Sequence, residues 1–412
     1  MNNSFGLIAC SLFLLLALTA CGGGSSGDTG GGTPTTAPPS TTKGPGIGST
    51  PGTTSGSPSD GNNPAATGTA HAFAYVTGAT GAINPGFTPS VFAYNIDADT
   101  GGLDAIRITE LDPRSTSGLA LAAHPSGKFL YVYAIVYVDG YDSDPTSQIW
   151  AFTIDPATGA LSMIGVISAG TPMTAGTIGV EPSGRFLYVS GSLSNETRIY
   201  RISGSGELAQ TGALSGAQFV PRLMHPSGKF TYLTEPGGVR AYRIDATSGD
   251  LVSMGPLQTI ALRALDPTGR FGYATSSEFS AYSVGEDGSL TPIGSAALEA
   301  GSIPSVTVGT GGKFAYVTNY TSNSVSTYAI SATGTPTFVG TITIGNTDSG
   351  VFDVTTEPSG KFAYLSVASN FTRFNAVGVY SIDPATGILA KTGLSGARAT
   401  NGGAVAIVST GG

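Results

Sequence analysis

The chain has 412 residues, of which 40% are hydrophobic and only 11% are charged, and it contains 61 Gly and 25 Pro. Charged residues normally form about a quarter of a globular chain, so Gly, Ser, Thr and Asn must supply much of this surface, which disfavours a helical protein. The net charge of −8 leaves no basic field for phosphates, so we expect no nucleic-acid partner.

The N-terminal segment predicts export. Residues 12–20 form an apolar run of about the length of a secretory hydrophobic region, too short to span a bilayer as a helix. The run ends at residues 18–21, Leu-Thr-Ala-Cys, which resemble a bacterial lipobox. This resemblance implies that residues 1–20 are a signal peptide and that Cys21 is diacylated. A second lipobox-like segment ends at Cys10, but hardly any apolar sequence precedes it, so we prefer Cys21.

Gly rather than Asp follows Cys21, so the lipobox resemblance implies an anchor in the outer membrane of a Gram-negative host. The sequence does not distinguish the periplasmic side of that membrane from the cell-surface side. Both cysteines of the chain lie in this N-terminal segment. The sequence that follows therefore has neither a disulfide nor a Cys-ligated metal.

A low-complexity segment comes next. Residues 22–70 contain 14 Gly, 11 Thr, 7 Ser and 7 Pro. Such a composition cannot bury enough apolar surface to offset the entropy of ordering. We interpret residues 21–70 as the lipidated Cys and a disordered tether with a span on the order of 40 Å. Residues 71–412 are then one folded domain that reaches the membrane only through the lipid.

The rest of the chain repeats one pattern seven times. An apolar stretch leads to a His/Glu/Asp-Pro-Ser-Gly turn, then to Lys/Arg-Phe-x-Tyr-Val, a variable loop, a second alternating run and a turn like Asp-Pro-Ala-Thr-Gly. The aligned Phe residues are Phe73, Phe129, Phe186, Phe230, Phe271, Phe314 and Phe362. Their spacing is typical of four-stranded propeller blades. We predict an all-β, seven-bladed propeller.

The two ends of the domain predict how the ring closes. The first repeat lacks an inner strand, because the segment before Phe73 is the tether. Residues 404–408, Ala-Val-Ala-Ile-Val, match an inner strand but no blade follows them. We expect this C-terminal strand to complete blade 1, which leaves no exposed inner edge.

These repeats resemble the lactonase-type seven-bladed propellers of the YVTN family, which include bacterial 6-phosphogluconolactonases and fungal carboxymuconate cyclases. Residues 316–319 read Tyr-Val-Thr-Asn, and variants occur at residues 75–78, 188–191 and 364–367. The resemblance covers nearly all of residues 71–412. It implies the fold more strongly than the chemistry, because such propellers include both enzymes and binding scaffolds.

Three charged residues stand out on the predicted inner strands. Arg222 and Arg263 each lie three residues before the turn-opening residue, and Asp353 lies on the inner strand of blade 7. Two guanidinium groups at equal height repel unless an anion lies between them, so the arginines are candidates for binding a carboxylate or phosphate. The alternative is that each pairs with an acidic residue. Asp353 is the first candidate for activating water, and Glu299 and Arg114 are weaker ones.

The loops between second and third strands are long in blades 7, 1 and 2. We expect them to form a wall on one side of the channel, with Tyr137, Tyr141, Phe371, Arg373 and Phe374 as candidate ligand contacts. The alternative is variation at tolerant loop positions.

Histidines and acidic clusters offer no clear metal site. His124 and His225 share their repeat position with Glu181, Asp266 and Glu357, which predicts turn partners. Three histidines without close spacing do not predict zinc. Asp139, Asp142 and Asp144 could supply oxygen ligands to calcium, but their spacing fits no EF-hand loop, and solvated loop acids are the simpler interpretation. We expect no cofactor and no metal.

Two functions remain open. The first is hydrolysis of an anionic lactone, with Arg222 and Arg263 holding the anion and Asp353 assisting water. The second is a non-catalytic surface or periplasmic binding module that uses the long loops of blades 7, 1 and 2. In both we expect a monomer whose partner is a small lactone or a surface ligand.

Overall fold

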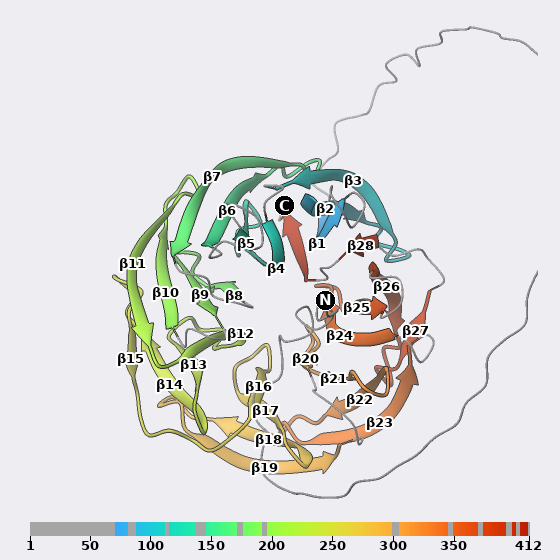
Figure 1. Cartoon of the computed structure of the whole chain (residues 1–412). Coiled ribbons are helices and arrows are strands. Elements are labelled where there is room, and N and C mark those ends of the chain that lie inside the picture. Colours follow the sequence, from blue (N-terminus) through green and yellow to red (C-terminus); the bar gives the residue numbers. More distant parts are fainter. Residues whose placement is uncertain are drawn as a thin grey trace, which may run out of the picture. The chain divides into compact units, whose positions relative to one another are not determined.

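The computed structural model describes residues 71–80, 88–111, 115–136, 146–170, 176–191, 196–298, 305–344, 349–369, 374–392, 398–400 and 404–410. These residues form 29 strands and contain no helix, so no helix among them is long and apolar enough to cross a membrane. The strands form seven antiparallel sheets arranged in a ring (Figure 1), which is the predicted seven-bladed propeller.

Each blade is listed from its inner to its outer strand. Blade 1 contains β29 (Val405–Thr410), β1 (His71–Thr80), β2 (Thr88–Ile96) and β3 (Leu103–Glu110). Blade 2 contains β4 (Ser115–Ala123), β5 (Phe129–Val136), β6 (Thr146–Ile154) and β7 (Leu161–Gly170). Blade 3 contains β8 (Gly176–Val180), β9 (Phe186–Gly191), β10 (Glu196–Ile202) and β11 (Leu208–Ser215). Blade 4 contains β12 (Gln218–Met224), β13 (Phe230–Glu235), β14 (Gly238–Ile244) and β15 (Leu251–Ser253).

The remaining three blades follow the same order. Blade 5 contains β16 (Leu262–Leu265), β17 (Phe271–Thr275), β18 (Glu278–Val284) and β19 (Leu290–Ala297). Blade 6 contains β20 (Val306–Val308), β21 (Phe314–Asn319), β22 (Ser324–Ile330) and β23 (Pro336–Thr343). Blade 7 contains β24 (Ser349–Thr356), β25 (Phe362–Ser369), β26 (Phe374–Ile382) and β27 (Leu389–Lys391), and β28 (Arg398–Thr400) also pairs with β26.

The ring closes as the sequence predicts. The C-terminal β29 pairs antiparallel with β1, and Val408 lies opposite Phe73. Figure 1 shows this red strand among the blue and green strands of the first blades. Blade 1 thus takes strands from both ends of the propeller, and every inner strand is paired.

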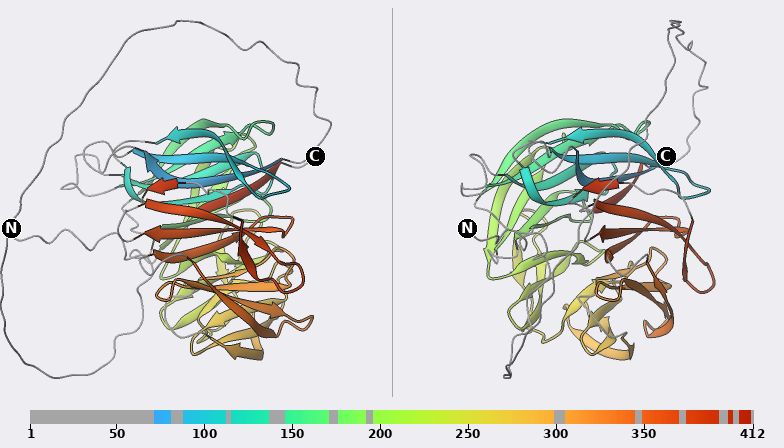
Figure 2. Two further views of the ribbon diagram at one scale, coloured as in Figure 1. Left: turned by 90° about the vertical axis from the view of Figure 1, so that its right-hand side faces the viewer. Right: turned by 45° about the vertical axis from the view of Figure 1, so that its right-hand side comes forward.

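The strands run between the two faces of the ring (Figure 2). The turns from first to second and from third to fourth strands lie on one face, here called the turn face. The connections from second to third strands and between blades lie on the other, the loop face. This division follows from antiparallel strand order, and it determines which side chains meet around the centre.

The repeated Phe-x-Tyr motif joins each blade to the next. Its two side chains share a face of the second strand, and each Tyr hydroxyl donates a hydrogen bond to a Gly carbonyl oxygen on the following blade. The seven bonds are Tyr75 to Gly159 (2.8 Å), Tyr131 to Gly206 (3.1 Å), Tyr188 to Gly249 (2.9 Å), Tyr232 to Gly288 (2.9 Å), Tyr273 to Gly334 (3.2 Å), Tyr316 to Gly387 (3.1 Å) and Tyr364 to Gly101 (2.9 Å). They form a closed circuit around the ring.

The acceptor glycines are required by geometry. Gly159 has a φ of 69°, and an added Cβ would lie 2.5 Å from the ring of Phe73 in the preceding blade. A side chain there would meet both backbone strain and a packed aromatic ring. The repeat therefore pairs a Phe with a Gly across the blade interface.

The turn-opening residues are turn partners, as predicted. Nδ1 of His124 lies 2.7 Å from Ser126 Oγ within its own turn, while Nε2 donates to the carbonyl oxygen of Gly184 on blade 3 at 2.8 Å. His225 contacts Gly269 of blade 5 in the same way at 3.1 Å. These histidines stabilise blade interfaces on the turn face.

Candidate functional site

The three charged inner-strand residues all lie at irregularities in strand pairing. Arg222 falls in the register shift between Phe219 and Met224 of β12. Arg263 is the extra residue between Leu262 and Ala264 of β16, and Asp353 ends the shift that starts at Val351 of β24. A β-bulge adds a residue on one strand and redirects side chains, and bulges concentrate next to active sites.

Arg222, Ser305 and Asp353 form a connected polar cluster. Nη1 of Arg222 donates to Ser305 Oγ at 2.5 Å, and Nη2 forms an ion pair with Asp353 Oδ2. The Ser305 hydroxyl donates to Asp353 Oδ1 at 3.1 Å. The three residues come from blades 4, 6 and 7, so the cluster joins the adjacent blades 6 and 7 to blade 4, which neighbours neither of them.

The cluster is held in place by the backbone and remains open to solvent. Asp353 Oδ1 also accepts a hydrogen bond from the Val354 N–H at 2.8 Å. The Ser305 N–H donates to Thr318 Oγ1 at 3.0 Å, which fixes the residue before β20. The side chains of Arg222 and Asp353 are 33% and 34% exposed. Water can therefore reach the carboxylate.

Arg263 has a different environment. Its Nε donates to Thr275 Oγ1 at 3.1 Å, and it has no carboxylate partner among the residues that the structure describes. Burial lowers the pKa of Arg263 below its ordinary value. A half-buried guanidinium without a counter-charge is a candidate for binding an anion.

The sequence left two interpretations of these arginines open, anion binding or pairing with an acidic residue, and the two arginines differ in this respect. Arg222 is paired with an acidic residue, although that residue lies on blade 7 and not on a neighbouring blade. Arg263 is paired with a hydroxyl only, within the described part of the chain.

For the other predicted site residues, the structure describes no side-chain position. Cys21, Tyr137, Tyr141 and Arg373 lie outside the described residues, as do Phe371, Glu299, Arg114 and the three loop aspartates at 139, 142 and 144. The backbone of Phe374 begins β26 and lies opposite Thr400 of β28.

Ser305 was not predicted from the sequence. It lies four residues before the turn-opening Gly309, as Asp353 lies four before Glu357, so both occupy the same register on adjacent blades. That equivalence was the available signal. The pattern of this turn is weaker than in the other repeats, because Gly309 replaces the acidic or His residue that marks the other turns.

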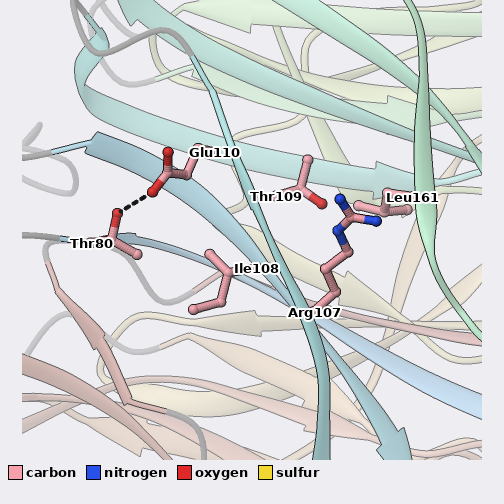
Figure 3. Close-up of a pocket in the computed structure, with 6 residues that line it drawn as sticks. All are labelled: Thr80, Arg107, Ile108, Thr109, Glu110 and Leu161. Carbon is pink, nitrogen blue, oxygen red and sulfur yellow. Dashed lines mark hydrogen bonds between the residues drawn. The ribbon is translucent and has the colours of Figure 1, made fainter.

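Two cavities formed by described residues on the outer part of the ring lie away from this cluster. One of about 380 Å³ lies between the outer parts of blades 1 and 2 and is lined by Thr80, Arg107, Ile108, Thr109, Glu110 and Leu161 (Figure 3). Its dashed contact is a hydrogen bond of 3.2 Å from Thr80 to Glu110. Within the described ranges, no three His, Cys, Asp or Glu residues gather to hold a metal. The inner-strand cluster is the better candidate site.

The fold and the cluster together define a seven-bladed propeller with a charged site among its inner strands. The family model for lactonase, 7-bladed beta-propeller, matches residues 86–214 and 228–351, more than half of the chain. The chain belongs to this lactonase family. Arg222 lies between the two matched segments and Asp353 just beyond the second. No curated protein matches the chain.

Solved structures agree on the fold. A periplasmic gluconolactonase from Pseudomonas aeruginosa is 20% identical, with a TM-score of 0.64 over 82% of this chain and 99% of its own. A candidate 6-phosphogluconolactonase from Bacteroides uniformis is 18% identical, with a TM-score of 0.63 over 82% of this chain and 99% of its own. At such identities the likeness concerns the fold.

Proposed function

We propose that this protein hydrolyses an anionic lactone at the inner-strand cluster. The observation that carries the proposal is the Asp353 carboxylate, held by Arg222 and Ser305 and one-third exposed. The same ring also carries Arg263, which has no counter-charge among the described residues. Family membership supports the reaction class, and the names of the two structural neighbours support a lactone substrate.

The cluster suits ester hydrolysis. Asp353 takes a proton from a water molecule as the water oxygen attacks the lactone carbonyl carbon. The Arg222 guanidinium beside it stabilises the negative charge that develops on the carbonyl oxygen. The ring C–O bond then breaks, the leaving oxygen takes the proton from Asp353, and the product is one hydroxy acid. Arg263 binds the anionic substituent and orients the ring.

Steady-state kinetics of the full-length protein test this function. We expect turnover of phosphorylated or carboxylated lactones to exceed that of a neutral sugar lactone. Arg263→Ala should raise KM about tenfold or more for anionic substrates, because a charge-assisted contact is lost. Arg270→Ala is the control, since that guanidinium lies over Phe271 on blade 5. Equal turnover of neutral and anionic lactones by the native protein, or an unchanged KM for anionic lactones in Arg263→Ala, would contradict the proposal.

We also propose that the protein is a lipoprotein anchored through Cys21, with residues 22–70 as its tether, and that the propeller acts as a monomer. The sequence before residue 71 supports the lipid anchor and the tether. Mass spectrometry of the mature N-terminus from a Gram-negative host should find diacylated Cys21. Cys21→Ala should abolish lipidation while Cys10→Ala leaves it intact, and the reverse pattern would assign the anchor to Cys10.

A further inference from the structure

Phe352 is exposed at an unusual place. Six large apolar side chains of the described residues are well exposed: Ile108, Met163, Val166, Val252, Phe338 and Phe352. The first five lie on outer strands, where exposed apolar residues are ordinary. Phe352 lies on the inner strand β24 with 39% exposure, beside the charged cluster.

The β24 bulge brings this ring to the same side as the carboxylate. Successive residues of a regular strand point to opposite faces. Phe352, however, contacts Tyr320 of blade 6, and the adjacent Asp353 contacts Ser305 of the same blade. The bulge between Val351 and Asp353 explains this shared direction.

Tyr320 and Phe352 form a preorganised aromatic pair. Their ring centroids are 5.1 Å apart with an interplanar angle of 40°. Tyr320 also lies so close to Gly350 that an added Cβ would be 2.3 Å from its Cε2. Glycine at this position therefore lets the Tyr320 ring approach the strand that carries Phe352.

The pair lies on the loop-face side of the cluster. Tyr320 follows β21 in the connection to β22, and Phe352 precedes Asp353 on a strand that runs toward the turn face. A molecule that enters from the loop face would meet the aromatic rings before it reaches Asp353.

We propose that Phe352, supported by Tyr320, is a specificity-determining platform that stacks against the ring of an anionic cyclic ligand. The inference rests on the proposed function for its location and deepens it by substrate class: a ring with an apolar face that carries an anionic group. The exposed aromatic face contacts the ring, and an inner-strand arginine contacts the anion.

Binding of simple carboxylates by the full-length protein tests the platform without turnover. Calorimetric or NMR titration with benzoate and acetate compares anions with and without a ring. We expect benzoate to bind more tightly, and Phe352→Ala to weaken benzoate about threefold to tenfold while acetate changes little. Phe338→Ala is the matched control, because Phe338 is 49% exposed and contacts Tyr328 on the outer part of blade 6.

Two further variants separate the platform from general damage. Phe352→Leu keeps an apolar side chain and should retain part of the benzoate preference. Gly350→Ala displaces Tyr320 and should weaken benzoate in a protein that still carries both rings. The proposal is overturned if benzoate does not bind, if it binds no better than acetate, or if Phe352→Ala leaves the preference intact. A Phe352-dependent preference in a protein without lactone turnover would support the platform and reject the hydrolysis.

Discussion

Arg222 of blade 4 and Asp353 of blade 7 form an ion pair although two blades separate them in the ring. The pair therefore joins strands that no backbone ladder connects. The other polar atoms of the pair, Nη1 of Arg222 and Oδ1 of Asp353, both form hydrogen bonds with the Ser305 hydroxyl, so the three side chains form one connected unit.

A double-mutant cycle should detect this unit. Arg222→Gln and Asp353→Asn, alone and together, should show a coupling of about 0.5–1.5 kcal/mol in the free energy of unfolding, reduced by their one-third exposure. The pair Arg243 and Asp245, 4.0 Å apart and more exposed, should show a smaller coupling. Additive effects at Arg222 and Asp353 in urea unfolding would argue against the contact.

Tyr364 closes the circuit of interblade hydrogen bonds by donating to Gly101 of blade 1. Tyr364→Phe removes this hydroxyl and leaves a buried acceptor, so we expect a loss of about 1 kcal/mol in unfolding free energy. Tyr282→Phe is the control, because the Tyr282 hydroxyl has no hydrogen bond within the described residues. Equal stability of the two variants would show that the hydrogen bond from Tyr364 to Gly101 adds nothing to stability.

Gly159 should tolerate no side chain. Its φ of 69° and the ring of Phe73 2.5 Å from a Cβ predict that Gly159→Ala costs about 1–3 kcal/mol in unfolding free energy. Gly165→Ala should be nearly neutral, because no atom lies within 4 Å of its Cβ position. Thermal unfolding of both variants measures the difference, and a neutral Gly159→Ala would reject the Phe–Gly pairing.

His225 should make stability depend on pH. Burial lowers its pKa below the ordinary value of 6.5, and its hydrogen bond to Gly269 opposes the shift only in part. The unfolded chain then binds the proton more tightly, so the stabilising contribution is present above about pH 6.5 and is lost as the pH falls toward the lower folded pKa.

The measurement is urea unfolding at about pH 8 and about pH 5. The native protein should lose more stability on acidification than His225→Gln, which cannot titrate there. Parallel losses in the two proteins would exclude His225 as a source of the pH dependence.

The sequence predicted the blades and their closure because the Phe-x-Tyr and turn motifs recur in every repeat, and each repeat forms one blade of the same strand order. It also drew attention to Arg222, Arg263 and Asp353, because charge is rare on these inner strands. Their partners were not predictable. Bulges shift the register of β12, β16 and β24, so side-chain direction does not follow from spacing.

The roles of Ser305 and Phe352 were also not predictable from the sequence. Serine and phenylalanine are common in this chain, and only their neighbours make these two distinctive. Ser305 becomes a candidate site residue through its contacts with blades 4 and 7, and Phe352 through its exposure on an inner strand. Contacts between distant blades depend on the closed ring, which a single repeat does not contain.

The most direct test of the central claim is the kcat of the full-length protein and of folded Asp353→Asn on the anionic lactone that the native protein hydrolyses fastest. Asparagine keeps the shape of the side chain but cannot accept the proton from water. We predict a fall in kcat of about 10²-fold or more with little change in KM. Undiminished kcat in Asp353→Asn would contradict a hydrolytic site at this cluster.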